Sequence, residues 1–215
     1  EATKTVIERA VKVVRSMTEV PRVASIIYGN LFIVGQLKQP RTLAWYNLMA
    51  DEVYLRPHAR VDSEETHNLT HEFGHRYWFK VLTQKARSQW ATYHMLRGFH
   101  PPSEVSLPKP GDAFPIPIAG KKTPPIVLRI EGDQVFFTDG FAVSRSKTLA
   151  ILRRDATYPT PYATTSPEEH FAEAFAMWGL GTLKPDHRAA FEAIVIRGES
   201  YRPGQTSATR VASRW

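Results

Sequence analysis

The segment from Ser63 to Val81 constrains the fold most, because a helix-start signal and two histidines four residues apart coincide in it. Ser63 or the residue before it can cap a helix N-terminus, so the helix should run to about Val81. His71 and His75 are four residues apart, project from one face of that helix and can bind one metal ion. Gly74 lies between them although glycine costs a helix about 1 kcal/mol relative to alanine. We therefore expect another element to approach the helix closely at Gly74.

The residues from His71 to His75 also have the order H-E-x-x-H that is typical of zinc metallopeptidases. There, two neutral imidazoles bind the ion, and Glu72 can accept a proton from water without binding the metal. The alternative is a surface helix with incidental histidines. His67 lies one turn earlier, but three successive turns of one helix cannot surround one ion. We expect His67 either to support the site from behind or simply to be exposed.

A catalytic zinc ion needs a third protein ligand and an open position. The residues after His75, RYWFKVLTQKA, contain no His or Asp, so the third ligand must come from elsewhere. Residues 162–178 read YATTSPEEHFAEAFAMW and predict a helix that begins at Pro167. Glu169 and Glu173 lie four residues apart beside its apolar face, where a carboxylate is costly unless it is paired or bound to a metal. A solvated acidic edge is the alternative interpretation.

The segments HEFGH and EHFAEAFA, with a tyrosine seven residues before the first glutamate of the second segment, resemble the family of the anthrax lethal factor catalytic domain and the Pro-Pro endopeptidases. The resemblance covers these two helices and does not extend to residues 98–147. It implies three zinc ligands, which are His71, His75 and Glu169.

The same resemblance implies a role for three further residues. Glu72 would be the general base, Tyr162 would donate a hydrogen bond to the developing oxyanion, and Glu173 would orient a ligating histidine. The implied cofactor is Zn²⁺, with no other cofactor-binding residues. The two segments are separated by about 90 residues that include a proline-rich stretch, so no cleavage specificity transfers.

The hydrophobic pattern predicts an α+β fold, and the resemblance implies a zincin-like one, with a small mixed sheet packed on the helix that carries H-E-x-x-H. The stretch from Val23 to Val34 reads as a strand, or as a hairpin turning at Gly29-Asn30. The other expected elements are helices at Thr3–Met17, Lys85–Leu96, Pro167–Gly179 and Pro185–Ile196, strands at Leu43–Tyr46 and Glu52–Leu55, and a hairpin of Ile126–Ile130 and Gln134–Thr138.

The chain has 215 residues, 42% of them hydrophobic, which suffices for one globular core. We expect a single catalytic domain over residues 1–197, with residues 98–147 as an insertion that combines a proline-rich loop and the hairpin. Residues 198–215 would form a polar tail. The first residue is Glu1 rather than Met, which indicates a fragment or a processed product.

Composition limits the chemistry. The chain has no cysteine, so a metal must be held by His, Asp or Glu. No apolar run is long enough to span a bilayer. The net charge is +7, but the basic residues are spread along the chain, and no recognition motif supports a nucleic-acid partner.

Together these features predict a zinc-dependent endopeptidase that hydrolyses peptide bonds in a protein or peptide substrate. The alternative is a binding or structural module of a toxin or phage particle that keeps the zinc site without peptidase activity. The strands around Tyr46 to Leu55 could bind an extended peptide by edge pairing. Known members of the family act outside the cell that makes them, so the resemblance favours a secreted or virion-associated protein. The substrate, the organism and the oligomeric state stay open.

Overall fold

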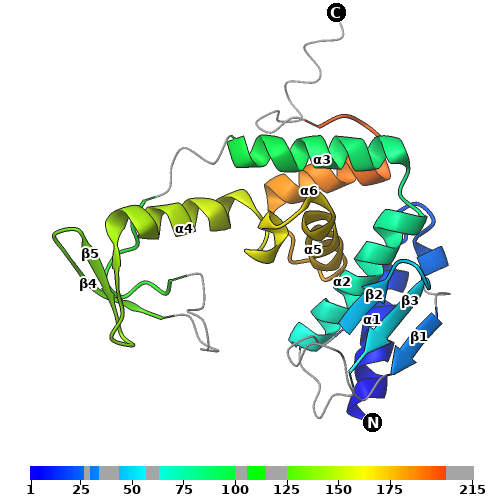
Figure 1. Ribbon diagram of the computed structural model, residues 1–215, viewed down its shortest axis with the longest axis horizontal. Coiled ribbons are helices and arrows are strands. Elements are labelled where there is room, and N and C mark those ends of the chain that lie inside the picture. Colours follow the sequence, from blue (N-terminus) through cyan, green and yellow to red (C-terminus); the bar gives the residue numbers. More distant parts are fainter. Residues whose placement is uncertain (27–29, 34–43, 57–62, 100–105, 115–124, 202–215) are drawn as a thin grey trace, which may run out of the picture. The chain divides into compact units, whose positions relative to one another are not determined.

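The computed structural model describes residues 1–26, 30–33, 44–56, 63–99, 106–114 and 125–201 (Figure 1). These residues form an α+β protein in two compact units. One unit comprises residues 1–96 together with 162–215, and the other comprises residues 97–161. Within the described ranges, no helix has the length and apolar character needed to cross a membrane.

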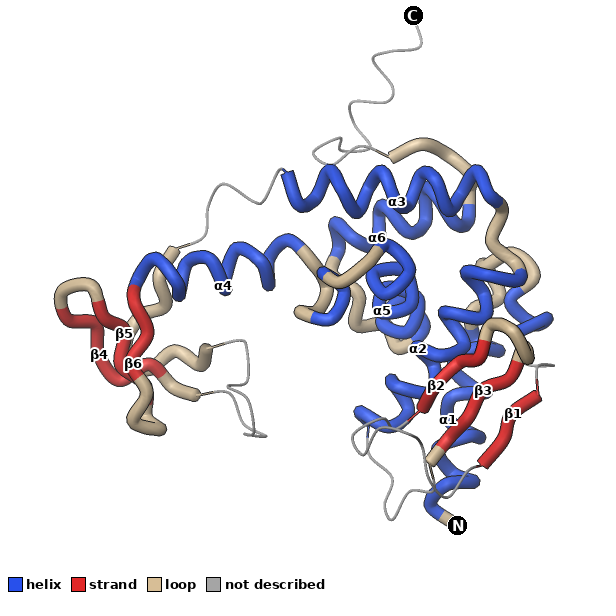
Figure 2. Tube along the Cα trace, in the orientation of Figure 1, coloured by secondary structure: helices blue, strands red, loops and turns tan. Residues whose placement is uncertain are grey.

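The first unit combines a helical core with a small sheet (Figure 2). The predicted helices at the N-terminus and around residues 63–80, 84–99 and 167–179 are confirmed, with small shifts at their ends. The elements are α1 (Ala2–Ser16), η1 (Val23–Ile26), β1 (Asn30–Ile33), β2 (Ala44–Asn47), β3 (Glu52–Leu55), α2 (Ser63–Lys80), α3 (Gln84–Phe99), η2 (Tyr162–Thr164), α5 (Pro167–Gly179), α6 (Pro185–Phe191) and the π-helical turn η3 (Glu192–Ile196).

The sheet of this unit has the strand order β1-β3-β2. Strand β1 pairs with β3 in parallel, and β2 pairs with β3 antiparallel, so the sheet is mixed. Alternate side chains of β2 and β3 are buried, including Tyr46 and Val53, whereas Trp45 faces solvent and stacks on Tyr54. The predicted strands around residues 43–46 and 52–55 are therefore confirmed, and β2 lies at an edge of the sheet.

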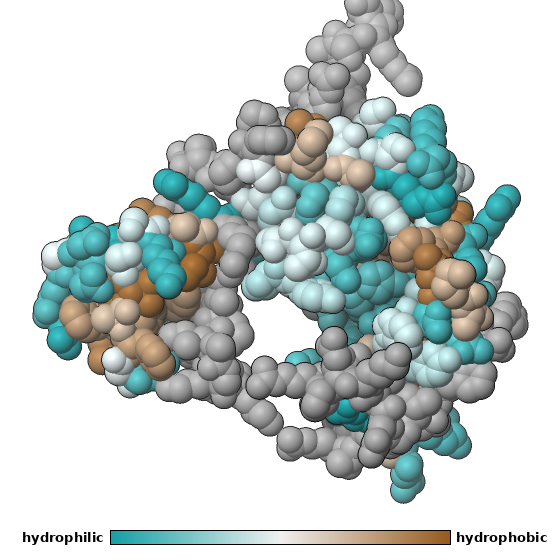
Figure 3. All heavy atoms as spheres, in the orientation of Figure 1, coloured by the Kyte–Doolittle hydropathy of each residue, from teal (hydrophilic) through white to brown (hydrophobic). Residues whose placement is uncertain are grey.

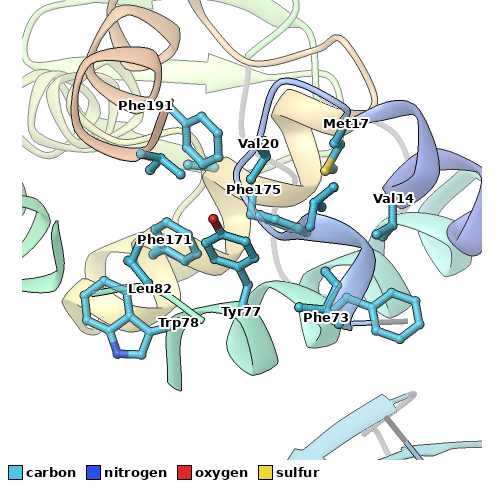
Figure 4. Close-up of a cluster of buried hydrophobic side chains, with 14 of the residues drawn as sticks. Val14, Met17, Val20, Phe73, Tyr77, Trp78, Leu82, Phe171, Phe175 and Phe191 are labelled. Atoms are coloured by element: carbon cyan, nitrogen blue, oxygen red, sulfur yellow. The ribbon is translucent and has the colours of Figure 1, made fainter. Parts of the chain in front are cut away.

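The core of the first unit forms where α1, α2, α5 and α6 meet (Figure 4). Tyr77 of α2 packs against Phe171 and Phe175 of α5, with ring centroids 6.0 and 5.5 Å apart. Phe191 of α6 stacks on Phe171 at 5.9 Å. Burying each such side chain contributes about 1.5–3 kcal/mol, so this cluster fixes α5 against α2.

Two predictions for the first unit are wrong. Residues 23–26 form the 3₁₀ helix η1 rather than a strand. Arg22 takes a positive φ of 56°, and the amides of Val23 and Ser25 then bond to carbonyls three residues earlier. The hairpin at Gly29-Asn30 is also wrong, because the residues of its first strand form η1. The second part of the predicted strand is confirmed as β1, which pairs in parallel with β3; Gly29 itself lies outside the described residues. The predicted helix at residues 185–196 is α-helical only to residue 191 and continues as η3.

The second unit contains a small antiparallel sheet and one helix. Its elements are β4 (Val127–Glu131), β5 (Gln134–Phe137), β6 (Ala142–Ser144) and α4 (Arg145–Thr157). The predicted hairpin is confirmed, and its turn contains Gly132 at a φ of +53°. Strand β6 and helix α4 were not predicted. A small apolar core joins Phe114, Val127, Val135 and Phe137.

The predicted insertion and tail are only partly described. Residues 100–105 and 115–124 of the proline-rich stretch, and residues 202–215 of the tail, lie outside the described ranges. The compact second unit spans residues 97–161, whereas the expected insertion was residues 98–147. In the tail, the Tyr201 ring contacts Tyr93 edge-on, with centroids 5.5 Å apart.

Candidate metal centre

Helices α2 and α5 approach each other closely at Gly74. A Cβ atom at this position would lie 2.9 Å from the Ala172 Cα and 3.2 Å from its carbonyl oxygen, where no side chain fits without a backbone shift. The expectation that another element approaches Gly74 is therefore confirmed. Because the backbones come so near, side chains of only moderate length on the two helices can meet.

His71, His75 and Glu169 meet on the facing surfaces of α2 and α5. The Nε2 atoms of both histidines lie 3.1 Å from the same oxygen, Oε2 of Glu169. The amide of Glu169 donates to the Ser166 side chain at the N-terminus of α5, and this cap fixes the first turn that carries the carboxylate. One ligand atom from each of the three residues falls within 4.8 Å of the others, so the set could hold a metal ion.

A second set, His67, His71 and Glu173, continues the first along the helices and could also hold a metal ion. Glu173 Oε1 lies 3.0 Å from Nδ1 of His71, an ion-pair distance at an angle outside hydrogen-bond geometry. Glu173 Oε2 lies 3.2 Å from Nε2 of His67. His67 is therefore partly buried and bonded to Glu173 rather than simply exposed. We call the alternating row the histidine–glutamate ladder; its members are His75, Glu169, His71, Glu173 and His67.

The ladder places His71 between two carboxylates, and these groups shift one another's pKa values. Burial alone lowers the pKa of His71, but the nearby carboxylates of Glu169 and Glu173 more than offset this and raise the pKa to about 10. Burial favours the neutral form of Glu169, yet His71 and His75 together lower its pKa to about 2. The protonated imidazole of His71 thus lies between the carboxylates of Glu169 and Glu173, where a bound cation would offset the same negative charge. The nitrogen and carboxylate donors are those that zinc accepts, so the residues present fit this ion.

Glu72 lies beside the ladder and belongs to neither set. Its Oε2 accepts a hydrogen bond of 2.8 Å from the backbone N–H of Tyr46 in the edge strand β2. Burial raises the pKa of Glu72, and the neighbouring His71 and His75 oppose this rise. The carboxylate is therefore held in place by the sheet rather than by the helix that carries it.

Tyr162 stands on the solvent side of the ladder. Its hydroxyl donates to Glu169 Oε1 at 3.2 Å, and its ring lies 5.8 Å from that of His71. Half of the side chain is exposed, at 54%. Burial of the remainder and the adjacent Glu169 raise the pKa of Tyr162 to about 12, so the hydroxyl keeps its proton at neutral pH.

The structure thus brings together all six residues that the sequence singled out. Two contacts were missed. The Tyr46 amide has no sequence signature, because every residue except proline carries one. The bond from His67 to Glu173 could have been found from spacing, since each lies four residues from a member of the first set.

Comparison with known proteins adds no identification. No family model matches the chain, and neither a curated protein nor a solved structure does. The function must therefore be argued from the site.

Proposed function

We propose that the protein is a zinc-dependent endopeptidase in which His71, His75 and Glu169 hold the metal. The observation that carries this proposal is the convergence of three donors on one point, with a carboxylate and a phenol beside them on separate elements. A purely structural zinc site needs neither Glu72 nor Tyr162, because its four positions are closed by protein ligands. The two extra groups favour catalysis.

The fold we propose for the first unit is zincin-like, of the lethal factor and Pro-Pro endopeptidase type. What supports it is the mixed sheet with an edge strand beside the helix that carries the two histidines. The glutamate ligand and the tyrosine, seven residues apart, come from a second helix and the turn before it. This interpretation keeps the roles that the sequence resemblance implied.

A bound zinc ion would supply a Lewis acid that polarises a carbonyl group and lowers the pKa of water. Glu72 would accept the proton of the attacking water at its carboxylate and pass it to the leaving amine. The Tyr46 N–H keeps one oxygen of that carboxylate fixed, which leaves the other oxygen for the proton. Tyr162 keeps its proton at neutral pH and would donate a hydrogen bond to the developing oxyanion.

The substrate would be an extended peptide paired with the edge of β2 that lies opposite β3 in the described sheet. The Tyr46 N–H points away from β3 and towards Glu72, so this edge runs past the proposed base. Antiparallel edge strands bind peptides through main-chain hydrogen bonds. The exposed Trp45 would lie beside the peptide and offer an apolar contact.

The decisive experiment is Glu72→Gln, compared with Glu64→Gln as a matched control. Glu64 is exposed in the first turn of the same helix. Wild type and Glu64→Gln should cleave sites in a peptide library, mapped by mass spectrometry, whereas Glu72→Gln should bind zinc and cleave nothing. Full activity of Glu72→Gln would refute the proposed base. A wild type that binds zinc and cleaves no peptide would favour the non-enzymatic module.

Two further variants separate metal binding from chemistry. Glu169→Ala removes a proposed ligand and should lower zinc occupancy, measured by elemental analysis after dialysis. Tyr162→Phe should keep its zinc and lose turnover, because one such donor contributes about 2.7–4 kcal/mol to transition-state stabilisation. Unchanged zinc occupancy in Glu169→Ala would remove it from the ligand set.

A further inference from the structure

The histidine–glutamate ladder extends one helical turn beyond the proposed zinc ligands. Its last two members, Glu173 and His67, are joined by a 3.2 Å contact between Oε2 and Nε2. The other oxygen of Glu173 lies 3.0 Å from Nδ1 of His71. The proposed function assigns a role to His71 but none to His67.

Glu173 is a buried carboxylate, only 6% exposed, and its neighbours along α5 are the fully buried Ala172 and Ala174. Such a group is costly unless its oxygens are paired. Each carboxylate oxygen of Glu173 lies against one histidine nitrogen, Oε2 against Nε2 of His67 and Oε1 against Nδ1 of His71. The two histidines therefore account for both oxygens, and without His67 one oxygen would lose its partner inside the protein.

The contact at Nδ1 decides which nitrogen of His71 can bind a metal. A neutral imidazole carries its proton on one nitrogen and a lone pair on the other. The negative charge of Glu173 Oε1, 3.0 Å from Nδ1, favours the proton on that nitrogen even though the angle lies outside hydrogen-bond geometry. The lone pair then lies on Nε2, which faces Glu169 and His75. Ring orientation and proton position thus both depend on where Glu173 lies.

We propose that His67 is a positioning residue that anchors Glu173 and thereby presents Nε2 of His71 to the metal. The inference rests on the metal set of the proposed function. A second ion bound by His67, His71 and Glu173 would need the lone pair on Nδ1 of His71. One neutral imidazole cannot offer both lone pairs, so a second ion would compete with the first.

The test measures zinc binding rather than peptide cleavage. Zinc dissociation constants are determined by chelator competition at one pH for wild type, His67→Ala, His67→Gln and the control Asn68→Ala. Loss of a group that orients a metal ligand typically weakens metal binding about 10–100-fold. His67→Ala should raise the zinc dissociation constant about 10-fold, at the lower end of this range, because Glu173 keeps its contact with His71. His67→Gln carries an N–H near the position of Nε2 and should recover most of the affinity, and Asn68→Ala should bind as wild type does.

A spectroscopic measurement excludes a merely structural role. In the zinc-loaded protein labelled with ¹⁵N-histidine, the Nδ1–H signal of His71 should shift in His67→Ala and return in His67→Gln. Equal zinc affinity and an unchanged His71 signal in His67→Ala would overturn the inference. A fall from two bound zinc ions to one in that variant would overturn it too, because His67 would then be a ligand. If wild type binds no zinc, the proposed function fails first, and the two failures are distinguishable.

Discussion

Replacing Gly74 by alanine tests the contact that brings α2 and α5 together. The new Cβ would lie 2.9 Å from the Ala172 Cα, whereas ordinary contacts begin near 3.4 Å. The helices must therefore part by about 0.5 Å, because the obstacle is backbone and cannot rotate away. Alanine favours the helix by about 1 kcal/mol over glycine, but overpacking of this kind costs about 1–3 kcal/mol.

We expect Gly74→Ala to lower the free energy of unfolding by up to about 2 kcal/mol, since a backbone clash lies in the upper part of the overpacking range. The assay is urea unfolding of the metal-free protein. Oε2 of Glu169 lies 3.1 Å from Nε2 of His75 in the wild type. A larger separation of the helices would lengthen this distance, so zinc binding should weaken. Gly179→Ala is the control for metal affinity, because its Cβ would meet the side chains of Val13 in α1 and of Met17, the residue after α1, rather than α2. If Gly74→Ala is as stable as wild type and binds zinc equally well, the reasoning is refuted.

Three further predictions concern single groups. Ser166→Ala removes the cap of α5 and should cost about 1 kcal/mol of unfolding free energy in urea. Asp51 pairs with both Nε and Nη2 of Arg76 at 2.9 Å, and this guanidinium lowers the pKa of Asp51. The pair therefore stabilises the fold above the unfolded pKa, and unfolding curves should show that this stability is lost below about pH 4 in wild type and not in Asp51→Asn. The pKa of His71 in the metal-free protein is about 10, so zinc binding at pH 7 should release its proton. Calorimetry in buffers of different ionisation enthalpy measures this release, and a buffer-independent heat would contradict it.

The elements predicted well from the sequence are those whose signals are local. Pro167 follows the capping Ser166 at the start of α5, and the helix begins there as expected. The turn at Gly132 lies between two short apolar runs and produces the hairpin. In both cases the residues that fix the backbone lie within a few positions of one another.

The elements missed depend on distant partners or on a mixed pattern. A strand at the residues of β1 was predicted, but its parallel pairing with β3 was not, because periodicity cannot reveal a partner about twenty residues along the chain. Helix α4 was not predicted, although its partly buried residues Leu149 and Leu152 have a spacing compatible with a helix. The segment follows a hairpin directly, and two apolar positions are a weak helical signal there. The 3₁₀ helix η1 has β-branched residues at Val23 and Ile26, which favour strands. In the 3₁₀ helix both side chains are buried, because residues three apart lie on the same face.

The candidate site was predicted through one periodicity on two helices, and the structure adds the register between them. His67, His71 and His75 repeat every four residues on α2, and Glu169 and Glu173 repeat every four on α5. The contacts run from His75 through Glu169, His71 and Glu173 to His67, so the helices are antiparallel where they meet.

A rotation of α5 by one residue, about 100°, would carry both glutamates off this face together. The close approach of Gly74 to Ala172 and the aromatic contacts of Tyr77 oppose such a rotation. Packing that carries no functional group therefore determines whether the ladder forms. A sequence can show which side chains repeat on each helix. It does not show the rotation of one helix about its axis relative to the other, because that rotation depends on how the side chains of both helices pack together in the core.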